Sequence, residues 1–203
     1  MRIMGVDLAG IPTNPSGIAL LRGSTLRTLL VHEDEEIEKL CEREGVKLVA
    51  VDAPLSFPKH GSLRPSDLAL IRMGFRVFPP TFSGMRSLTS RGISLSLNLR
   101  KKKIVVIEVH PKTSGKILFG TSKREEWART LVKRGWEIKG KKGIHELDAC
   151  VSAITGHLYL LGRTIEVGGK GGIIIPAISW KSFGRTYTDW RLPPPPPRPL
   201  FSG

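Results

Sequence analysis

Arg2-Ile3-Met4-Gly5-Val6-Asp7-Leu8-Ala9-Gly10 opens the chain with an apolar run, an aspartate and a glycine-containing turn. This pattern is typical of a buried strand that ends in a carboxylate. An aspartate in this position is not specific alone, because aspartates also cap turns and the helices that follow them. Its meaning depends on the carboxylates that come later in the chain.

Three later carboxylates occur in comparable settings. Two close the apolar runs 46–51 and 104–107, and one lies in a helical run; they are Asp52, Glu108 and Asp148. A charged group at the end of a buried strand loses hydration unless it is paired or binds a cation. The sequence therefore predicts one shared site that contains all four acids. For Asp148 an alternative stays open, since a carboxylate in the first turn of a helix is favoured by the helix dipole.

The order of the apolar runs predicts an α/β fold. Residues 3–7, 16–21 and 25–31 are separated by turns rich in glycine and proline, which favours three antiparallel strands. Residues 33–44 form a helical pattern that ends at Gly45, and the following apolar run indicates a parallel strand covered on both faces. We expect a mixed sheet of three antiparallel strands plus parallel strands, flanked by helices.

The second half of the chain contains further helical patterns and one more strand. We expect helices near 67–73, 87–100, 112–119, 123–133 and 146–161, a basic loop over 135–143 and a strand at 173–176. These elements predict one domain over residues 1–178, with a helical insertion at about 63–101 that covers the site or forms part of the core. Residues 179–203 are a proline-rich extension, whose five consecutive prolines favour a polyproline II segment.

The charge balance favours a polyanionic partner. Lysine and arginine outnumber aspartate and glutamate by 32 to 18, which gives a formal charge of +14. Such an excess favours nucleic acid, DNA or RNA, through phosphate contacts and counterion release. A solvated basic surface is the alternative. The residues that we expect to contact phosphates are Arg64, Arg86, Lys101, Lys102 and Lys103.

Several classes of protein are disfavoured. The two cysteines, Cys41 and Cys150, have no metal-ligand spacing, and we expect both to be reduced packing residues. No apolar stretch is long enough to span a membrane or resembles a signal peptide, so we expect a soluble cytoplasmic protein without a membrane partner. The Gly-x-Ser-x-Gly elbow of serine hydrolases and the phosphate-binding glycine motifs of nucleotide-binding proteins are both absent.

Four carboxylates at one site suit hydrolysis of a phosphodiester with two metal ions. Oxygen ligands favour Mg²⁺ or Mn²⁺, which can activate water and stabilise the leaving oxygen. His110 follows the third acid by two residues, and Pro111 keeps it in an extended conformation. This histidine could position water, bind a metal or carry a proton, which makes it a catalytic candidate, or it could simply hold the loop.

The ordered motifs resemble a known family. Gly5-Val6-Asp7, Val51-Asp52-Ala53-Pro54-Leu55, Ile107-Glu108-Val109-His110-Pro111, His145-Glu146-Leu147-Asp148-Ala149 with Ala153, and Gly171-Gly172-Ile173-Ile174-Ile175-Pro176 are similar to the predicted nucleases of the ribonuclease H fold called domain of unknown function four-two-nine. The resemblance spans residues 1 to about 176. It implies a ribonuclease H-like core with the four acids at a metal site, and distant similarity to Holliday-junction resolvases adds branched nucleic acid and hybrids as candidate substrates.

Two other functions remain open at this stage. A nucleic-acid binding protein without catalytic activity would show the same basic balance, with its acids structural or degenerate. A nucleotide-dependent phosphotransferase of the actin-like class begins with a similar strand, hairpin and aspartate, but it normally needs two comparable domains. A homodimer would suit work on two-fold symmetric junctions, by analogy of fold.

Overall fold

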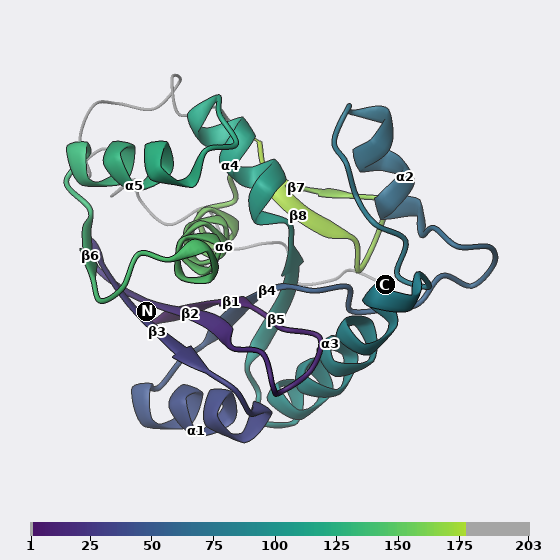
Figure 1. Cartoon of the computed structure of the whole chain (residues 1–203), viewed down its shortest axis with the longest axis horizontal. Coiled ribbons are helices and arrows are strands. Elements are labelled where there is room, and N and C mark those ends of the chain that lie inside the picture. Colours follow the sequence, from purple (N-terminus) through teal and green to yellow (C-terminus); the bar gives the residue numbers. More distant parts are fainter. Residues whose placement is uncertain (1, 178–203) are drawn as a thin grey trace, which may run out of the picture.

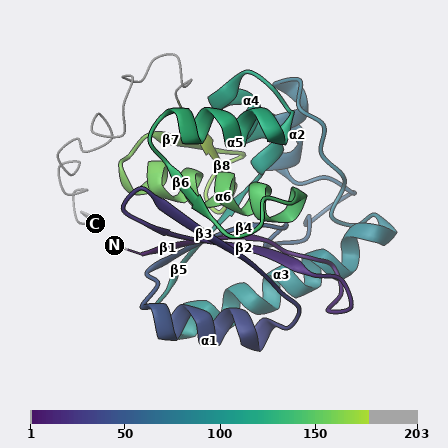
Figure 2. The ribbon, with the colours of Figure 1, turned by 60° about the vertical axis from the view of Figure 1, so that its left-hand side comes forward.

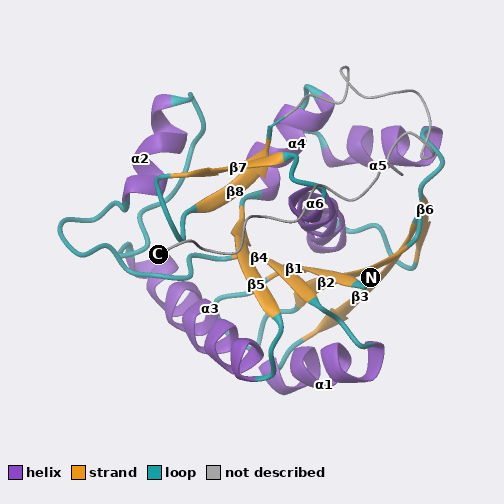
Figure 3. Cartoon of the chain, turned by 180° about the vertical axis from the view of Figure 1, so that it is seen from behind, coloured by secondary structure: helices purple, strands orange, loops and turns teal. Residues whose placement is uncertain are grey.

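The computed structural model describes residues 2–177, and the proline-rich extension lies outside the described residues. Within this part, eight strands form one sheet in the order β6-β3-β2-β1-β4-β5-β8-β7 (Figures 1 and 3). The strands are β1 (Ile3–Asp7), β2 (Ser16–Arg22), β3 (Thr25–Val31), β4 (Leu48–Asp52), β5 (Val105–Val109), β6 (Glu137–Lys139), β7 (Thr164–Val167) and β8 (Ile173–Pro176). The helices are α1 (Asp34–Glu44), α2 (Pro65–Arg72), α3 (Ser83–Lys101), α4 (Pro111–Phe119), α5 (Arg124–Lys133) and α6 (Ile144–Leu160).

The centre of the sheet has the predicted mixed topology. Strands β1, β2 and β3 pair antiparallel, and β4 lies parallel to β1, followed by β5 and β8 in parallel. This order confirms the expected α/β class, with three antiparallel strands followed by parallel ones and helices on both faces. The parallel strands β1, β4 and β5 therefore end at the same edge of the sheet.

Helices cover the two faces of the sheet unequally. Figure 2 shows α4, α5 and α6 on one face and α1 and α3 on the other. Alternate strand residues feed two cores: Ile3, Ala50 and Ile107 pack on the α6 side, whereas Val6 and Val51 pack on the other side. This alternation, with a period of two residues, decides which face each acid at a strand end can reach.

Helix α6 crosses β1 and β2 at unusually short range. A Cβ atom on Gly5 would lie 2.0 Å from the carbonyl oxygen of Ala149, and one on Gly17 would lie 2.2 Å from that of His145. Only glycine permits this approach, because the neighbouring atoms belong to backbone that cannot move aside cheaply. The two glycines thereby place the first turns of α6 directly over the end of β1.

Some elements differ from the sequence prediction. The segment expected to be a basic loop over 135–143 contains β6, which pairs in parallel with β3 and forms one edge of the sheet. Strand β7 was also not predicted; it and β6 have only four and three residues, too few to show a reliable alternation. The second half of α3 belongs to the core, since Leu95 and Leu99 are fully buried there. Among the described residues no helix is both long and apolar enough to cross a bilayer.

Candidate functional site

Asp7 and Asp52 are neighbours at the carboxyl ends of β1 and β4. The two residues are register partners in the parallel ladder, so their backbones lie about 4.8 Å apart, the usual spacing of strands. By the alternation of the strands both side chains point to the α6 side of the sheet, the side on which Ala50 packs and on which Gly5 faces α6. Two of the residues predicted to share a site are thus neighbours in the sheet.

Helix α6 adds a third carboxylate and a histidine. The ring Nδ1 of His145 lies 2.7 Å from Oδ2 of Asp7 and is hydrogen-bonded to it. Asp148 follows three residues later on the same helix, with a side chain that is 6% exposed. Because residues three apart share one face of a helix, both side chains come to the end of β1 together. Asp148 also contributes to the electrostatic environment of Asp7 and of Asp52.

The local environment disfavours negative charge on Asp7 and Asp52. Burial raises the pKa of Asp7 to about 6, with the charge of Asp148 adding to the rise and the hydrogen bond from His145 opposing it. Loss of hydration, followed by the charges of Asp7 and Asp148, raises the pKa of Asp52 well above its usual value. Raised pKa values of this origin mark carboxylates that are buried beside other carboxylates, an arrangement found at many functional sites.

Two cations, Arg124 and Lys112, lie next to these acids. Arg124, the first residue of α5, binds both oxygens of Asp148, with Nε to Oδ1 at 2.8 Å and Nη2 to Oδ2 at 2.5 Å. This pairing raises the pKa of Arg124. Lys112, near the start of α4, is exposed and lowers the pKa of Asp52 by its charge, and no carboxylate of the described chain is in ion-pair contact with it.

Glu108 lies at the end of β5 and lines the same cleft as Asp7 and Asp52, but it is paired with cationic and backbone groups of its own. Its register partner is Val51, so its side chain points to the opposite face from Asp52. There Arg64 binds both oxygens of Glu108, at 2.7 and 2.8 Å, and Asp67 through two further contacts of 2.8 and 3.0 Å. Oε2 of Glu108 also accepts a hydrogen bond of 2.8 Å from the backbone of Leu55. These contacts tie the loop after β4 to β5.

His110 is occupied as the cap of α4. Its Nδ1 accepts a hydrogen bond from the backbone N–H of Thr113 and lies 2.8 Å from the hydroxyl of the same residue. Burial lowers the pKa of His110 to about 4, so the ring is neutral at pH 7. The arrangement agrees with the alternative in which this histidine holds the loop, and at neutral pH the ring is not in the imidazolium form that a general acid needs.

The residues expected to contact phosphates are scattered. Arg64 is 4% exposed and fully engaged by the two acids described above, so it is not available to a phosphate. Lys102 pairs with Glu38 and Glu42. Lys101, Lys102 and Lys103 precede β5 and so lie at the amino ends of the parallel strands, whereas Asp7 and Asp52 lie at their carboxyl ends. Arg86 is exposed, and its neighbours Met85 and Leu88 line the same cleft as Asp7 and Asp52.

A cleft of about 180 Å³ opens at the carboxyl ends of the strands. Its lining includes Asp7, Asp52, Lys112, Glu108 and His110, together with apolar side chains from the segment between β4 and α3. Three neighbours of the acids were not singled out from the sequence: Lys112, Arg124 and His145. For His145 a signal existed, because it lies one helical turn before Asp148; nothing in the sequence pattern marked the other two.

The acids are close, but they do not form a finished metal site in this arrangement. Among residues 2–177, no three side chains of histidine, cysteine, aspartate or glutamate are placed so that they could hold one ion. The ion pair of Arg124 accounts for part of this, since it uses both oxygens of Asp148.

Comparisons with known proteins return similar structures only. No family model matches the chain, and no curated protein sequence is significantly similar to it. RuvC from T. thermophilus, solved in complex with a Holliday junction substrate, is 14% identical with a TM-score of 0.48, over 78% of this chain and 94% of that chain. The nuclease domain of the large terminase subunit gp2 of bacterial virus Sf6, as a K428A mutant with manganese and beta-thujaplicinol, is 10% identical with a TM-score of 0.38, over 95% of this chain and 88% of that chain.

Proposed function

We propose that this protein is a metal-dependent nuclease that hydrolyses phosphodiester bonds of nucleic acid, with Asp7, Asp52 and Asp148 as its metal-binding residues. The observation that carries the proposal is the convergence of these acids at the carboxyl ends of β1 and β4, where open α/β sheets bind their ligands. The strong net positive charge of the chain supports a polyanionic substrate.

The donor set fits a divalent cation in chemistry and in charge. All three ligands are carboxylates, which suit Mg²⁺ or Mn²⁺, and a bound cation would relieve the burial and mutual repulsion that raise the pKa values of Asp7 and Asp52. Asp148 has to release Arg124 before it can serve as a ligand. Bound there, metal ions would supply an activated water and stabilise the leaving oxygen.

The surrounding residues would orient the acids and the substrate. His145 fixes Asp7 through its 2.7 Å hydrogen bond, and Lys112 places a positive charge beside Asp52 for a substrate phosphate. Arg124, once released, offers a guanidinium that matches phosphate geometry. In this proposal Glu108 and His110 are positioning residues: one ties down the loop after β4 and the other caps α4.

A cleavage assay tests this proposal. Labelled single strands, duplexes, RNA–DNA hybrids and four-way junctions should be incubated with Mg²⁺ or Mn²⁺, using wild-type protein and Asp52→Asn. We expect cleavage of at least one substrate by the wild type, its loss on addition of EDTA and its loss in the variant. Equal rates for the two proteins would refute the assignment of Asp52.

Nucleic-acid binding without catalysis is the second candidate. The ion pair between Arg124 and Asp148 favours this function, because a carboxylate that is already paired with an arginine can be structural and needs no metal ion. This function predicts salt-sensitive binding and no uptake of Mn²⁺ at the acids.

Arg124 is expected to compete with the metal for Asp148. Charge-assisted hydrogen bonds contribute roughly 1.5–3 kcal/mol, so Arg124→Gln should tighten Mn²⁺ binding by about tenfold. Calorimetric titration at pH 7.5 measures this effect. Arg129→Gln, on the exposed side of the same helix, is the matched control and should leave Mn²⁺ affinity unchanged. Weaker or unaltered binding by Arg124→Gln would mean that the ion pair does not compete with a cation.

A further inference from the structure

Two phenylalanines form an exposed aromatic pair at the cleft. Phe78 is 66% exposed and Phe82 is 56% exposed. Their rings are stacked, with 6.5 Å between centroids and 23° between planes. Single exposed apolar side chains need no explanation, but two neighbouring exposed rings present a flat apolar surface to solvent.

The pair is held by rigid backbone. Phe78 precedes Pro79 and Pro80, which restrict its conformation, and Phe82 directly precedes the first turn of α3. The backbone N–H of Phe82 donates a 3.0 Å hydrogen bond to the carbonyl oxygen of Pro79, and Thr89 donates to that of Pro80. These contacts fix the backbone positions from which the two rings project, which lowers the entropic cost of ordering this segment when a partner binds.

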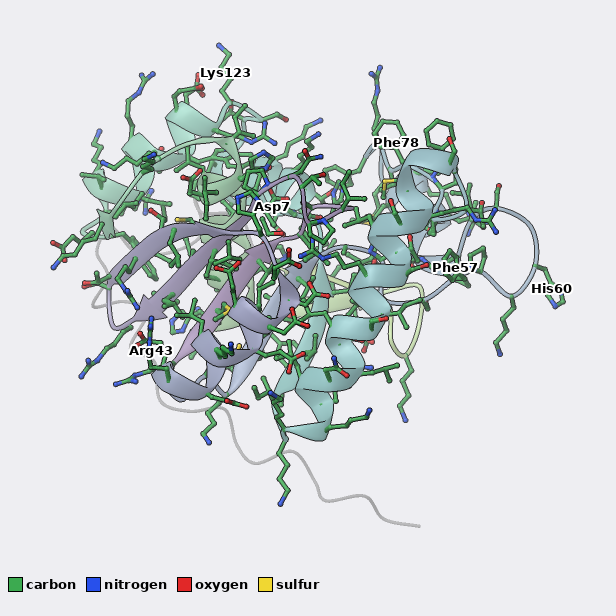
Figure 4. All side chains as sticks on the ribbon, turned by 60° about the horizontal axis from the view of Figure 1, so that its bottom comes forward. Asp7, Arg43, Phe57, His60, Phe78 and Lys123 are labelled. Atoms are coloured by element: carbon green, nitrogen blue, oxygen red, sulfur yellow. The ribbon has the colours of Figure 1, made fainter. Side chains whose placement is uncertain are left out.

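The pair adjoins the acidic site. Phe78 lines the same cleft as Asp7 and Asp52, together with Met85 and Leu88 from α3. Figure 4 shows Phe78 and Asp7 on the same side of the molecule, with Phe78 beside α3. A molecule that contacts the ring can thus extend directly to the acids.

The charge around the rings favours an anionic partner. Residues 68–90, which include both rings, contain three arginines and no aspartate or glutamate. Three arginines close to the rings in sequence, Arg72, Arg76 and Arg86, are exposed, and none has an ion-pair partner within residues 2–177. A basic surface with stacked aromatic rings matches the phosphates and the bases of a nucleic-acid strand, respectively.

We propose that Phe78 and Phe82 are a stacking platform for unpaired nucleobases, and that Arg76 and Arg86 hold the phosphates of the same strand. Bases in a duplex already stack on one another, so only an unpaired or extruded base can use a protein ring in this way. The substrate class that follows is single-stranded nucleic acid, or a branch or end with unpaired bases. Cleavage of a strand bound at the rings rests on the proposed function, whereas binding of the strand does not.

The test measures binding without divalent ions, so that it is independent of cleavage. A single strand of about twelve nucleotides that contains 2-aminopurine, and a duplex of the same sequence, are titrated with the full chain in EDTA. We expect stacking to quench the fluorescence of the strand, and Phe78→Ala to weaken its binding by at least about fivefold with less than about a twofold effect on the duplex. Phe78→Trp should keep the affinity, and Phe78→Leu should lose it.

Control variants separate this inference from its alternatives. Ile165→Ala removes a side chain that is 46% exposed on β7, away from the cleft, and should have no effect. The proposal is overturned if Phe78→Ala and Phe82→Ala alter neither affinity nor quenching, if they weaken strand and duplex equally, or if they only change the oligomeric state. Ring-dependent binding by a wild type that cleaves nothing would uphold the platform while refuting the nuclease proposal.

Discussion

Asp7→Asn is expected to abolish cleavage while making the metal-free protein more stable above pH 6. As a direct metal ligand, Asp7 should matter more than an outer partner, so we expect the cleavage rate to fall by at least about a hundredfold. Stability should change in the opposite direction, because the variant removes a charge that burial disfavours. An ordinary structural acid would instead lose stability with its charge.

The free energy of unfolding of the wild type should fall as the pH rises, because of the raised pKa of Asp7. Burial raises the pKa of Asp7 to about 6 in the folded state, against 3.8 ordinarily, which corresponds to roughly 3 kcal/mol. Below about pH 4 both folded and unfolded states are protonated and there is no penalty. Between pH 4 and 6 the folded wild type loses stability, and above pH 6 the full penalty remains. The advantage of Asp7→Asn should therefore grow across this window and then level off.

Urea denaturation in EDTA at pH 4.5 and 7.5 measures the effect. Adding Mn²⁺ at pH 7.5 should stabilise the wild type and leave Asp7→Asn unchanged, because binding to the folded state alone raises stability. Glu137→Gln, an exposed carboxylate on β6, is the matched control and should change neither property. If Asp7→Asn is less stable than the wild type at both pH values, the acid is structural and the metal proposal for it fails.

The sequence predicted the strand ends that carry Asp7 and Asp52, because each follows an apolar run of the length of a strand. It could not predict on which face Glu108 lies. The register pairs Glu108 with Val51 rather than with Asp52, and a shift of one residue turns a side chain to the other face of the sheet. Pairing between strands far apart in the chain leaves no mark on either strand alone.

The arginines show the same limit. Arg64 and Arg86 both precede or begin helical segments rich in apolar residues, yet one is buried among acids and the other is exposed. Asp67 was expected at the start of a helix, and it lies in the first turn of α2. Its Oδ2 accepts a 2.7 Å hydrogen bond from the backbone of Arg64, as an acid in the first turn of a helix often does. Which cation meets Glu108, however, depends on how the loop after β4 folds back over β5.

Arg64→Ala is expected to lower the free energy of unfolding by about 3–5 kcal/mol. The variant leaves Glu108 and Asp67 as two buried carboxylates that are 5% and 2% exposed, with no cation between them. Burial already raises the pKa of Glu108 although Arg64 opposes the rise, so removing Arg64 should raise it further. The added penalty is present above that pKa and relieved as Glu108 takes up a proton, so the deficit should shrink as the pH falls toward 4.5.

Urea denaturation at pH 7.5 and 5 measures this deficit, and binding of the labelled strand identifies its cause. Arg86 is exposed and has no ion pair with any residue from 2 to 177, so Arg86→Ala should change stability by less than about 0.5 kcal/mol. Arg64→Lys keeps the charge but not the bidentate contacts. Its free energy of unfolding should therefore lie between those of the wild type and Arg64→Ala. If Arg64 contacts phosphate, as the sequence suggested, Arg64→Ala would weaken nucleic-acid binding at unchanged stability. We expect lower stability instead, because Arg64 donates two hydrogen bonds to Glu108 and two to Asp67 and has no donor left for a phosphate.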